Sequence, residues 1–121
     1  MNALQILQII FAIATIATGL VSLVAPRAVR GFTGLDVSNA RGITEIRAVL
    51  GGVFIGLGAA PLIFHILAGY AVAHVAYQTL GIAYLAILIA RVIGMVLDKS
   101  WVRSNYISVA TELVLGIVLL L

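Results

Sequence analysis

The segment GITEIRAVLGGVFIGLG, residues 42–58, places Glu45 and Arg47 at the entrance to a long apolar run. The 43 residues that follow Arg47, from Ala48 to Ala90, contain no Asp, Glu, Lys or Arg. That is about twice the length of roughly 20 residues that a helix needs to cross the hydrocarbon core of a bilayer. The segment therefore predicts a helical hairpin inside a membrane, with two charged side chains where its first helix begins.

The composition of the 121-residue chain is typical of a membrane protein. Hydrophobic residues make up 64% of it and charged residues 9%, whereas soluble domains are nearer one half apolar and one quarter charged. The formal net charge is +3, but the basic residues alternate with apolar stretches, which argues against nucleic acid as a partner. Because the chain has no cysteine, disulfides and thiolate metal sites are excluded. We expect no cofactor.

Four apolar stretches predict an all-α, integral membrane four-helix bundle that forms a single domain over residues 1–121. The expected spans are 3–24, 44–67, 71–97 and 102–121. No basic residue precedes the first span. This span therefore lacks the basic start of a secretory signal and is expected to be retained.

The second span carries two local signals. Thr44 is its expected N-cap. Pro61, inside the span, cannot donate a backbone hydrogen bond and is expected to kink the helix near Gly58. Before this span, residues 26–42 are expected to form a loop with a short interfacial helix around 26–32.

The positions of the basic residues predict the topology. All seven lie in or near the two connections on one side of the spans, and they are Arg27, Arg30, Arg41, Arg47, Arg91, Lys99 and Arg103. The positive-inside rule places loops 25–43 and 98–103 in the cytoplasm and both termini outside, in a bacterial cytoplasmic (inner) membrane. Phe32 and Trp101 stand on the same side, where interfacial anchors are expected.

Ionisable and tyrosine side chains within the spans are the candidate site residues. At 1.5 Å per residue, Arg91 lies roughly 9 Å and Glu112 roughly 15 Å from the ends of their spans. A charge near the bilayer centre costs about 2.5–3.5 kcal/mol on insertion scales, so such groups normally face the bundle interior and pair. We expect one intramembrane polar cluster, made of Glu45, Arg47, Tyr77, Tyr84, Arg91, Asp98 and Glu112.

Helical spacing supports this cluster and predicts packing faces. In the third span, a seven-residue repeat joins Tyr70, Tyr77, Tyr84, Arg91 and Asp98. This spacing drifts only about 20° per repeat, so it predicts a nearly straight polar seam that faces the bundle. Small residues at four-residue spacing let helices approach closely. The residues expected in such helix contacts are Ala48, Gly52, Gly56 and Gly116.

The polar cluster has two possible roles. It can lock the four helices together, or it can bind a small molecule, because ionisable groups within spans are frequently functional. His65 and His74 flank the turn between the second and third spans, but two histidines without a third ligand do not predict a metal site. The sequence leaves open which arginine pairs with Glu112.

Resemblance to a known family rests on three segments: TEIRAVLGGVFIGLG at 44–58, ARVIGMVLD at 90–98 and TELVLG at 111–116. They are similar to a bacterial family of small four-span membrane proteins known only as a domain of unknown function. Its recurrent features fall here on Glu45, Arg47, Gly51, Gly52, Arg91, Gly94, Asp98 and Glu112. The chain departs from the usual family pattern with Lys99 in place of glycine and Leu50 in place of an aromatic residue. The resemblance implies the topology and this choice of residues, and it implies no activity.

Three functions compete. We expect a non-enzymatic helical membrane subunit that is surrounded by membrane lipids and joins a homo-oligomer or a larger membrane complex. The alternative is a binder or transporter of a small hydrophobic or anionic molecule. Small multidrug transporters place their key acid in the first span, which is uncharged here. The third is a lipid- or isoprenoid-modifying membrane enzyme with Glu45 or Glu112 as acid or base, but no nucleophile–base pair is recognisable, and we expect no catalytic residue.

Overall fold

The computed structural model describes all 121 residues and contains helices and no strands. In chain order the elements are α1 (Ala3–Val24), the 3-10 turn η1 (Pro26–Ala28), α2 (Val29–Thr33), α3 (Ala40–Glu45), the π-helical segment η2 (Ile46–Val53), α4 (Phe54–Ala68), α5 (Tyr70–Asp98) and α6 (Arg103–Leu120). Four helices are long and apolar enough to cross a membrane: α1, the continuous helix Ala40–Ala68, α5 and α6. The predicted all-α membrane bundle and the short helix after the first span are confirmed.

The second span begins four residues earlier than predicted. Asn39 is its N-cap, because the Asn39 backbone is extended and its side-chain oxygen accepts a hydrogen bond from the backbone N–H of Gly42 at 2.8 Å. Thr44 lies inside the helix and donates its hydroxyl to the carbonyl of Ala40 at 3.2 Å. The prediction of Thr44 as the cap was wrong, because a threonine hydroxyl is also satisfied by the preceding turn of its own helix.

The irregular part of this span lies at a glycine pair rather than at the proline. Helix α4 is unbroken across Pro61, whereas η2, which contains Gly51 and Gly52, has the wider π-helical turn. This segment packs against α1. The sequence did not indicate a π-helix at this position.

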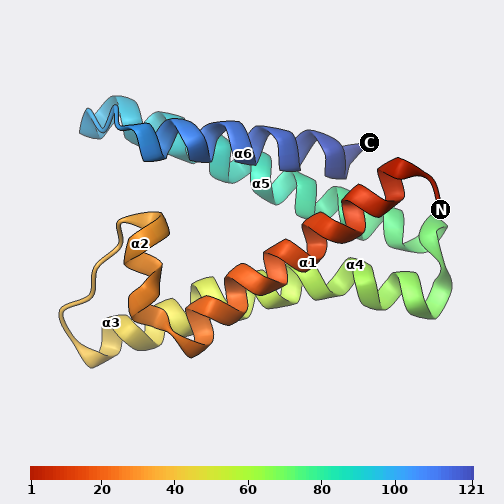
Figure 1. The fold of residues 1–121 in the computed structure, drawn as a ribbon, viewed down its shortest axis with the longest axis horizontal. Coiled ribbons are helices and arrows are strands. Elements are labelled where there is room, and N and C mark those ends of the chain that lie inside the picture. The colour runs from red at the N-terminus through yellow and green to blue at the C-terminus, as the bar shows by residue number, and fades with distance from the viewer.

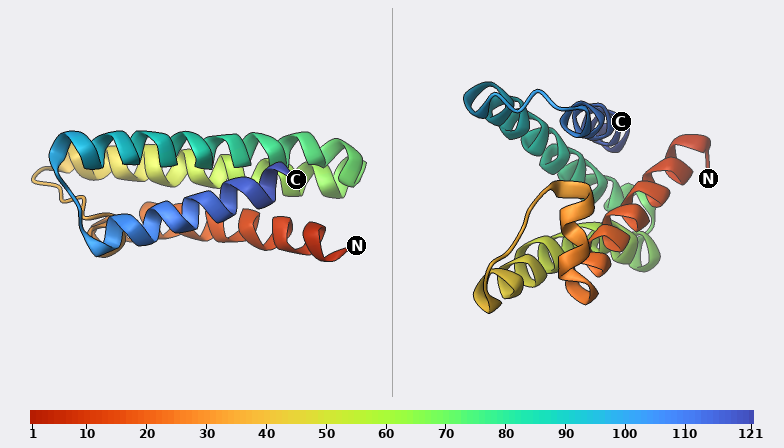
Figure 2. Two further views of the ribbon diagram at one scale, coloured as in Figure 1. Left: turned by 90° about the horizontal axis from the view of Figure 1, so that it is seen from above. Right: turned by 60° about the vertical axis from the view of Figure 1, so that its left-hand side comes forward.

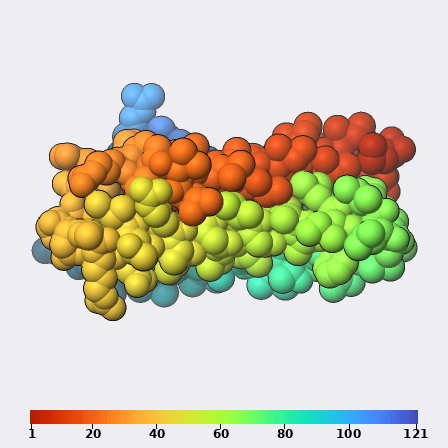
Figure 3. Space-filling model, turned by 90° about the horizontal axis from the view of Figure 1, so that it is seen from below, coloured from red at the N-terminus to blue at the C-terminus, as the bar shows by residue number.

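The helices form two pairs that meet at one end and diverge toward the other. Helix α1 runs beside α4 (Figures 1 and 3), and α5 runs beside α6 (Figure 1). The pairs are close near the two chain termini and near Gly69, which alone links α4 to α5. We call this the terminal end. The opposite end, which carries residues 25–39 and 99–102, is the loop end. There α2 lies in the space between the diverging pairs (Figures 1 and 2).

The hydrophobic core lies toward the terminal end. Its buried members are Ala12, Ala73, Tyr77, Leu80, Tyr84 and Leu119. Only 20 of the 121 residues are buried, because the outer faces of the four helices carry large apolar side chains that would meet lipid in a membrane. The core therefore fixes the helix order at the terminal end and leaves the loop end open.

Glycines make the close helix crossings. A Cβ atom on Gly58 would lie 2.7 Å from the carbonyl oxygen of Ala12, and one on Gly19 would lie 2.8 Å from that of Gly51. These two contacts join α1 to the second span. Between α5 and α6, a Cβ atom on Gly81 would lie 2.9 Å from the carbonyl oxygen of Gly116. At each crossing the missing side chain lets the two backbones approach.

Candidate functional site

The most polar contact inside the bundle joins Arg91 on α5 to Glu112 on α6. The Arg91 Nε donates to both carboxylate oxygens of Glu112, at 2.9 and 3.0 Å, and Nη2 donates to Oε1 at 2.6 Å. The Glu112 side chain is 8% exposed and the Arg91 side chain 30%. The structure thus resolves the open choice of partner: Glu112 pairs with Arg91, in the bidentate geometry that is strongest for this pair of groups.

The ion pair continues into the 99–102 connection. Arg91 Nη1 donates to the side-chain oxygen of Asn105 at 3.3 Å, and the Asn105 amide donates to the carbonyl of Ser100 at 2.9 Å. The buried charge is therefore held by a short chain of hydrogen bonds, all supplied by α5, α6 and the residues that link them. Such a pair stabilises a fold only while both partners are present, because either one alone would be an uncompensated buried charge.

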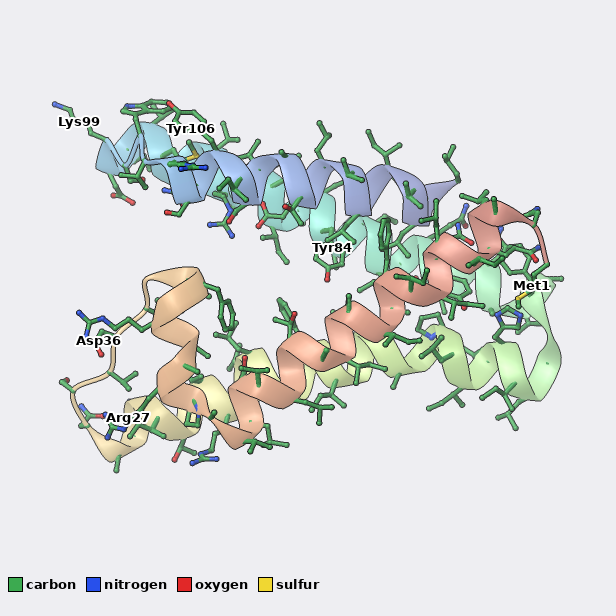
Figure 4. The ribbon with its side chains drawn as sticks, in the orientation of Figure 1. Met1, Arg27, Asp36, Tyr84, Lys99 and Tyr106 are labelled. Atoms are coloured by element: carbon green, nitrogen blue, oxygen red, sulfur yellow. The ribbon has the colours of Figure 1, made fainter.

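The tyrosine seam of α5 faces the bundle, as its spacing predicted. Tyr70 donates to the side-chain oxygen of Gln8 on α1 at 2.7 Å, and Tyr77 shares a hydrogen bond of 3.1 Å with Nδ1 of His65 on α4. The Tyr84 hydroxyl lies 2.5 Å from that of Thr15, on the side of α5 that faces α1 (Figure 4). Four members of the seam thus find partners on three other helices. The fifth, Asp98, is the last residue of α5 and is exposed.

The donor and acceptor at Tyr84 follow from the bonding of Thr15. The Thr15 hydroxyl lies 2.8 Å from the carbonyl of Phe11, to which it donates. Because a hydroxyl has only one proton, Thr15 accepts from Tyr84. All three groups are satisfied.

Sequence reasoning missed the partner side chains on α1. The buried residues of this helix are Gln8, Ala12, Thr15, Gly19 and Ser22, and Gln8, Thr15 and Ser22 are spaced by seven residues, the same period as the tyrosine seam. That shared period was the available signal. The prediction left these residues out because it considered only ionisable groups and tyrosines.

Two amide side chains donate hydrogen bonds to backbone carbonyls at the end of α6. Gln8 donates to the carbonyl of Val118 at 3.0 Å, and Gln78 donates to the carbonyl of Leu120 at 3.1 Å. The last carbonyls of a helix have no partner within it, so these contacts stabilise the end of α6 inside an apolar environment. Gln8 also accepts from Tyr70, and it therefore links α1, α5 and α6.

Glu45 and Arg47 do not join the cluster around Glu112. Both are exposed, and the Arg47 guanidinium donates to the carbonyl of Leu23, near the end of α1. The expectation of one shared network was wrong in this respect. The second span diverges from α5 and α6 toward the loop end, so its first charged residues lie on the other helix pair (Figure 1).

Only some of the predicted packing residues lie at a helix contact in the structure. Gly116 lies at the α5–α6 crossing. A Cβ atom added to Gly52 or Gly56 would have no neighbouring atom within 4 Å, and Ala48 is exposed. Gly52 and Gly56 therefore make no close helix contact within the chain, and the prediction that these three residues pack against a helix is not met inside the bundle and stays a prediction for contacts outside it. Gly51 and Gly58 hold the inner positions, because the contact with α1 determines which face of the second span turns inward.

An aromatic group closes the terminal end. The rings of His65, Tyr70, His74 and Tyr77 lie 5.3 to 6.1 Å from one another in four pairs. His74 Nε2 is buried and has no hydrogen-bond partner. No group of three or more His, Cys, Asp or Glu side chains has the arrangement of a metal site.

The cavities lie away from the ion pair. One of about 10 Å³, next to Thr15 and Tyr84, has room for about one water molecule. A groove of about 480 Å³ follows the outer α4–α5 contact and includes Ala60 and Ala76. Another of about 340 Å³ lies between α1 and α6 and includes Phe11 and Thr111. Neither Arg91 nor Glu112 lines any of these three spaces.

Comparison with known proteins gives one result. A family model described as "Domain of unknown function (DUF4345)" matches residues 3–121 of this chain. No curated protein and no solved structure matches it.

Proposed function

Because this chain belongs to the DUF4345 family, a domain of unknown function, we propose a function from its geometry: it is a non-enzymatic helical membrane subunit that associates with copies of itself. The association surface is the outward face of the second span, formed by Ala48, Gly52 and Gly56, which we call the small-residue face.

The small-residue face carries this proposal because it has no use within the chain. Glycine within a helix costs roughly 0.5–1 kcal/mol relative to alanine. At Gly51 and Gly58 the cost is offset by a close crossing with α1. At Gly52 and Gly56 nothing lies within 4 Å of the Cβ position. A lipid-facing helix gains nothing from glycine, whereas a helix from a second copy could approach closely there.

The state of the polar groups supports a structural role for the cluster. Arg91 and Glu112 satisfy each other, and the seam tyrosines have partners inside the chain. A ligand would have to displace these contacts, and the cavity beside Tyr84 holds only about 10 Å³. The alternative function, binding or transport of a small hydrophobic or anionic molecule, therefore has less support. Catalysis has less still, because Glu112 is held by an arginine and not by a proton-transfer partner.

We extend the proposal to the membrane and its sides. The chain resides in a bacterial cytoplasmic membrane with the loop end in the cytoplasm and the termini outside. Its support is the distribution of charge: every lysine and arginine lies at or near the loop end, and none lies at the terminal end. Cysteine labelling of Met1 and Lys99 positions in intact cells distinguishes the two sides.

Substitution on the small-residue face tests the association. In the double variant G52L/G56L the close approach is blocked, so the oligomer seen for the unchanged chain by native mass spectrometry in mild detergent should become monomeric. The matched control is V49L/V53L, which adds leucines at two exposed positions of the same helix and should leave the oligomer intact.

The fold itself provides the second readout. Gly52 and Gly56 are exposed, and a Cβ atom at either position has no neighbouring atom within 4 Å, so helical content by circular dichroism should not fall. A wild-type chain that is monomeric at every concentration, or a G52L/G56L variant that associates as the wild type does, would overturn the proposal.

A further inference from the structure

The loop end carries a group of exposed basic side chains that the internal contacts do not neutralise. Arg91 is paired with Glu112. The other six basic residues are all exposed, and they are Arg27, Arg30, Arg41, Arg47, Lys99 and Arg103. Three acidic residues lie at the same end, Asp36, Glu45 and Asp98, so the loop end has an excess of three positive charges.

Ion pairing at the loop end is weak. Arg30 lies 3.6 Å from Asp36, but the two side chains are 71% and 67% exposed. Pairs this exposed contribute little, and they remain available to other charged groups. Arg47 donates to a neutral carbonyl and keeps its charge. Figure 4 shows Lys99 and Arg27 on the two different helix pairs, both at the loop end.

Two exposed aromatic residues accompany these charges. Phe32 is 48% exposed and follows Arg30 on α2, and Trp101 is 53% exposed between Lys99 and Arg103. Aromatic rings beside arginine and lysine at the end of a span are typical of the headgroup level of a bilayer. Val29 is fully buried, so α2 is anchored to the bundle and holds Arg30 and Phe32 in place between the diverging helix pairs.

We propose that the loop end is a docking surface for anionic phospholipid headgroups, formed by Arg27, Arg30, Lys99 and Arg103 with Phe32 and Trp101. The phosphate of such a headgroup, which no cationic group of the lipid balances, complements the unneutralised cations, and the aromatic rings lie along the adjacent acyl chains. The surface has two parts, one on the 25–33 segment and one on the 99–103 segment. This inference is independent of the small-residue face and of self-association.

Lipid selectivity tests the surface. The full-length chain is reconstituted in phosphatidylcholine vesicles with a trace of spin-labelled phosphatidylglycerol or spin-labelled phosphatidylcholine. The motionally restricted fraction of each probe is then measured by electron paramagnetic resonance. A headgroup held by one cationic side chain should be preferred roughly fivefold over the neutral probe. The preference should fall toward one in 1 M salt, because the Debye length shrinks to about 3 Å.

Charge variants assign the preference to these residues. R27Q/R30Q/K99Q/R103Q should lose it, whereas the matched variant R27K/R30K/K99R/R103K, which retains every charge, should keep it. Circular dichroism checks that both are folded. Any one of three results would overturn the proposal. The wild-type chain could restrict the two probes equally, or its preference could be insensitive to salt. The glutamine variant could also keep the same preference as the wild type. The first two results do not depend on any variant.

Discussion

The two ends of the bundle are stabilised in different ways. At the terminal end, several helices share one apolar core, and neutral side chains such as Gln8 and Tyr70 link three of them. Toward the loop end the helix pairs separate, and α5 and α6 are joined by one ion pair. The difference indicates that the terminal end determines which helices are neighbours, while the ion pair determines the register of only one pair of helices.

The largest expected effect comes from breaking the ion pair. In E112A the guanidinium of Arg91 would remain partly buried without its carboxylate, which typically costs about 3–5 kcal/mol. Unfolding in a detergent titration should show this loss, and hydrogen exchange should accelerate in the loop-end halves of α5 and α6 more than at the terminal end.

The matched control replaces both charges. In R91M/E112L the two helices would be joined by apolar side chains of similar size, which is often neutral or stabilising for buried pairs. Recovery in this variant would assign the loss in E112A to the unpaired charge. A loss below about 1 kcal/mol in E112A, or exchange that accelerates equally at both ends, would contradict the distinction between them.

A middle-sized effect is expected at the helix crossing of α1 and α4. In G58A the new Cβ atom would lie 2.7 Å from the Ala12 carbonyl oxygen, and overpacking of this kind costs about 1–3 kcal/mol. G56A adds the same methyl group where no atom of the chain lies within 4 Å, so in a detergent that keeps the chain monomeric helix propensity should make it stabilising by about 0.5–1 kcal/mol. The free energies of unfolding should therefore change in opposite directions. If G58A and G56A changed the free energy of unfolding in the same direction, this crossing would not control the packing of α1.

The smallest effect is expected from the neutral hydrogen bonds. Y84F removes the bond to Thr15 and keeps the ring in the core. Hydrogen bonds between membrane helices average about 0.6 kcal/mol and reach about 1.7 kcal/mol, so a loss in that range is expected in the same titration. Y106F is the control, because Tyr106 is 52% exposed and its hydroxyl makes no hydrogen bond, and it should cause no change. A loss in Y84F that exceeds the loss in E112A would reverse the comparison between the two ends.

Local signals in the sequence predicted individual helices better than contacts between them. The spans follow from apolar length and charge, and the seam of α5 follows from a seven-residue period. The sequence did not predict that Asn39, and not Thr44, is the N-cap of the second span, because both side chains can form hydrogen bonds with backbone groups. The sequence also did not predict the π-helical turn of η2, which packs against α1.

The sequence by itself determined that the chain is a four-span, all-α membrane protein and that Arg91, Glu112 and the tyrosines of the α5 seam lie on faces turned toward other helices. Only the tertiary structure decided which of these residues meet. Helical period specifies the angle of a residue about its own axis, but not which helix lies opposite it. The divergence of the two helix pairs therefore separates Glu45 and Arg47 from Glu112, although all three belong to one side of the membrane in the sequence pattern. The same packing turns Gly51 and Gly58 inward and leaves Gly52 and Gly56 exposed.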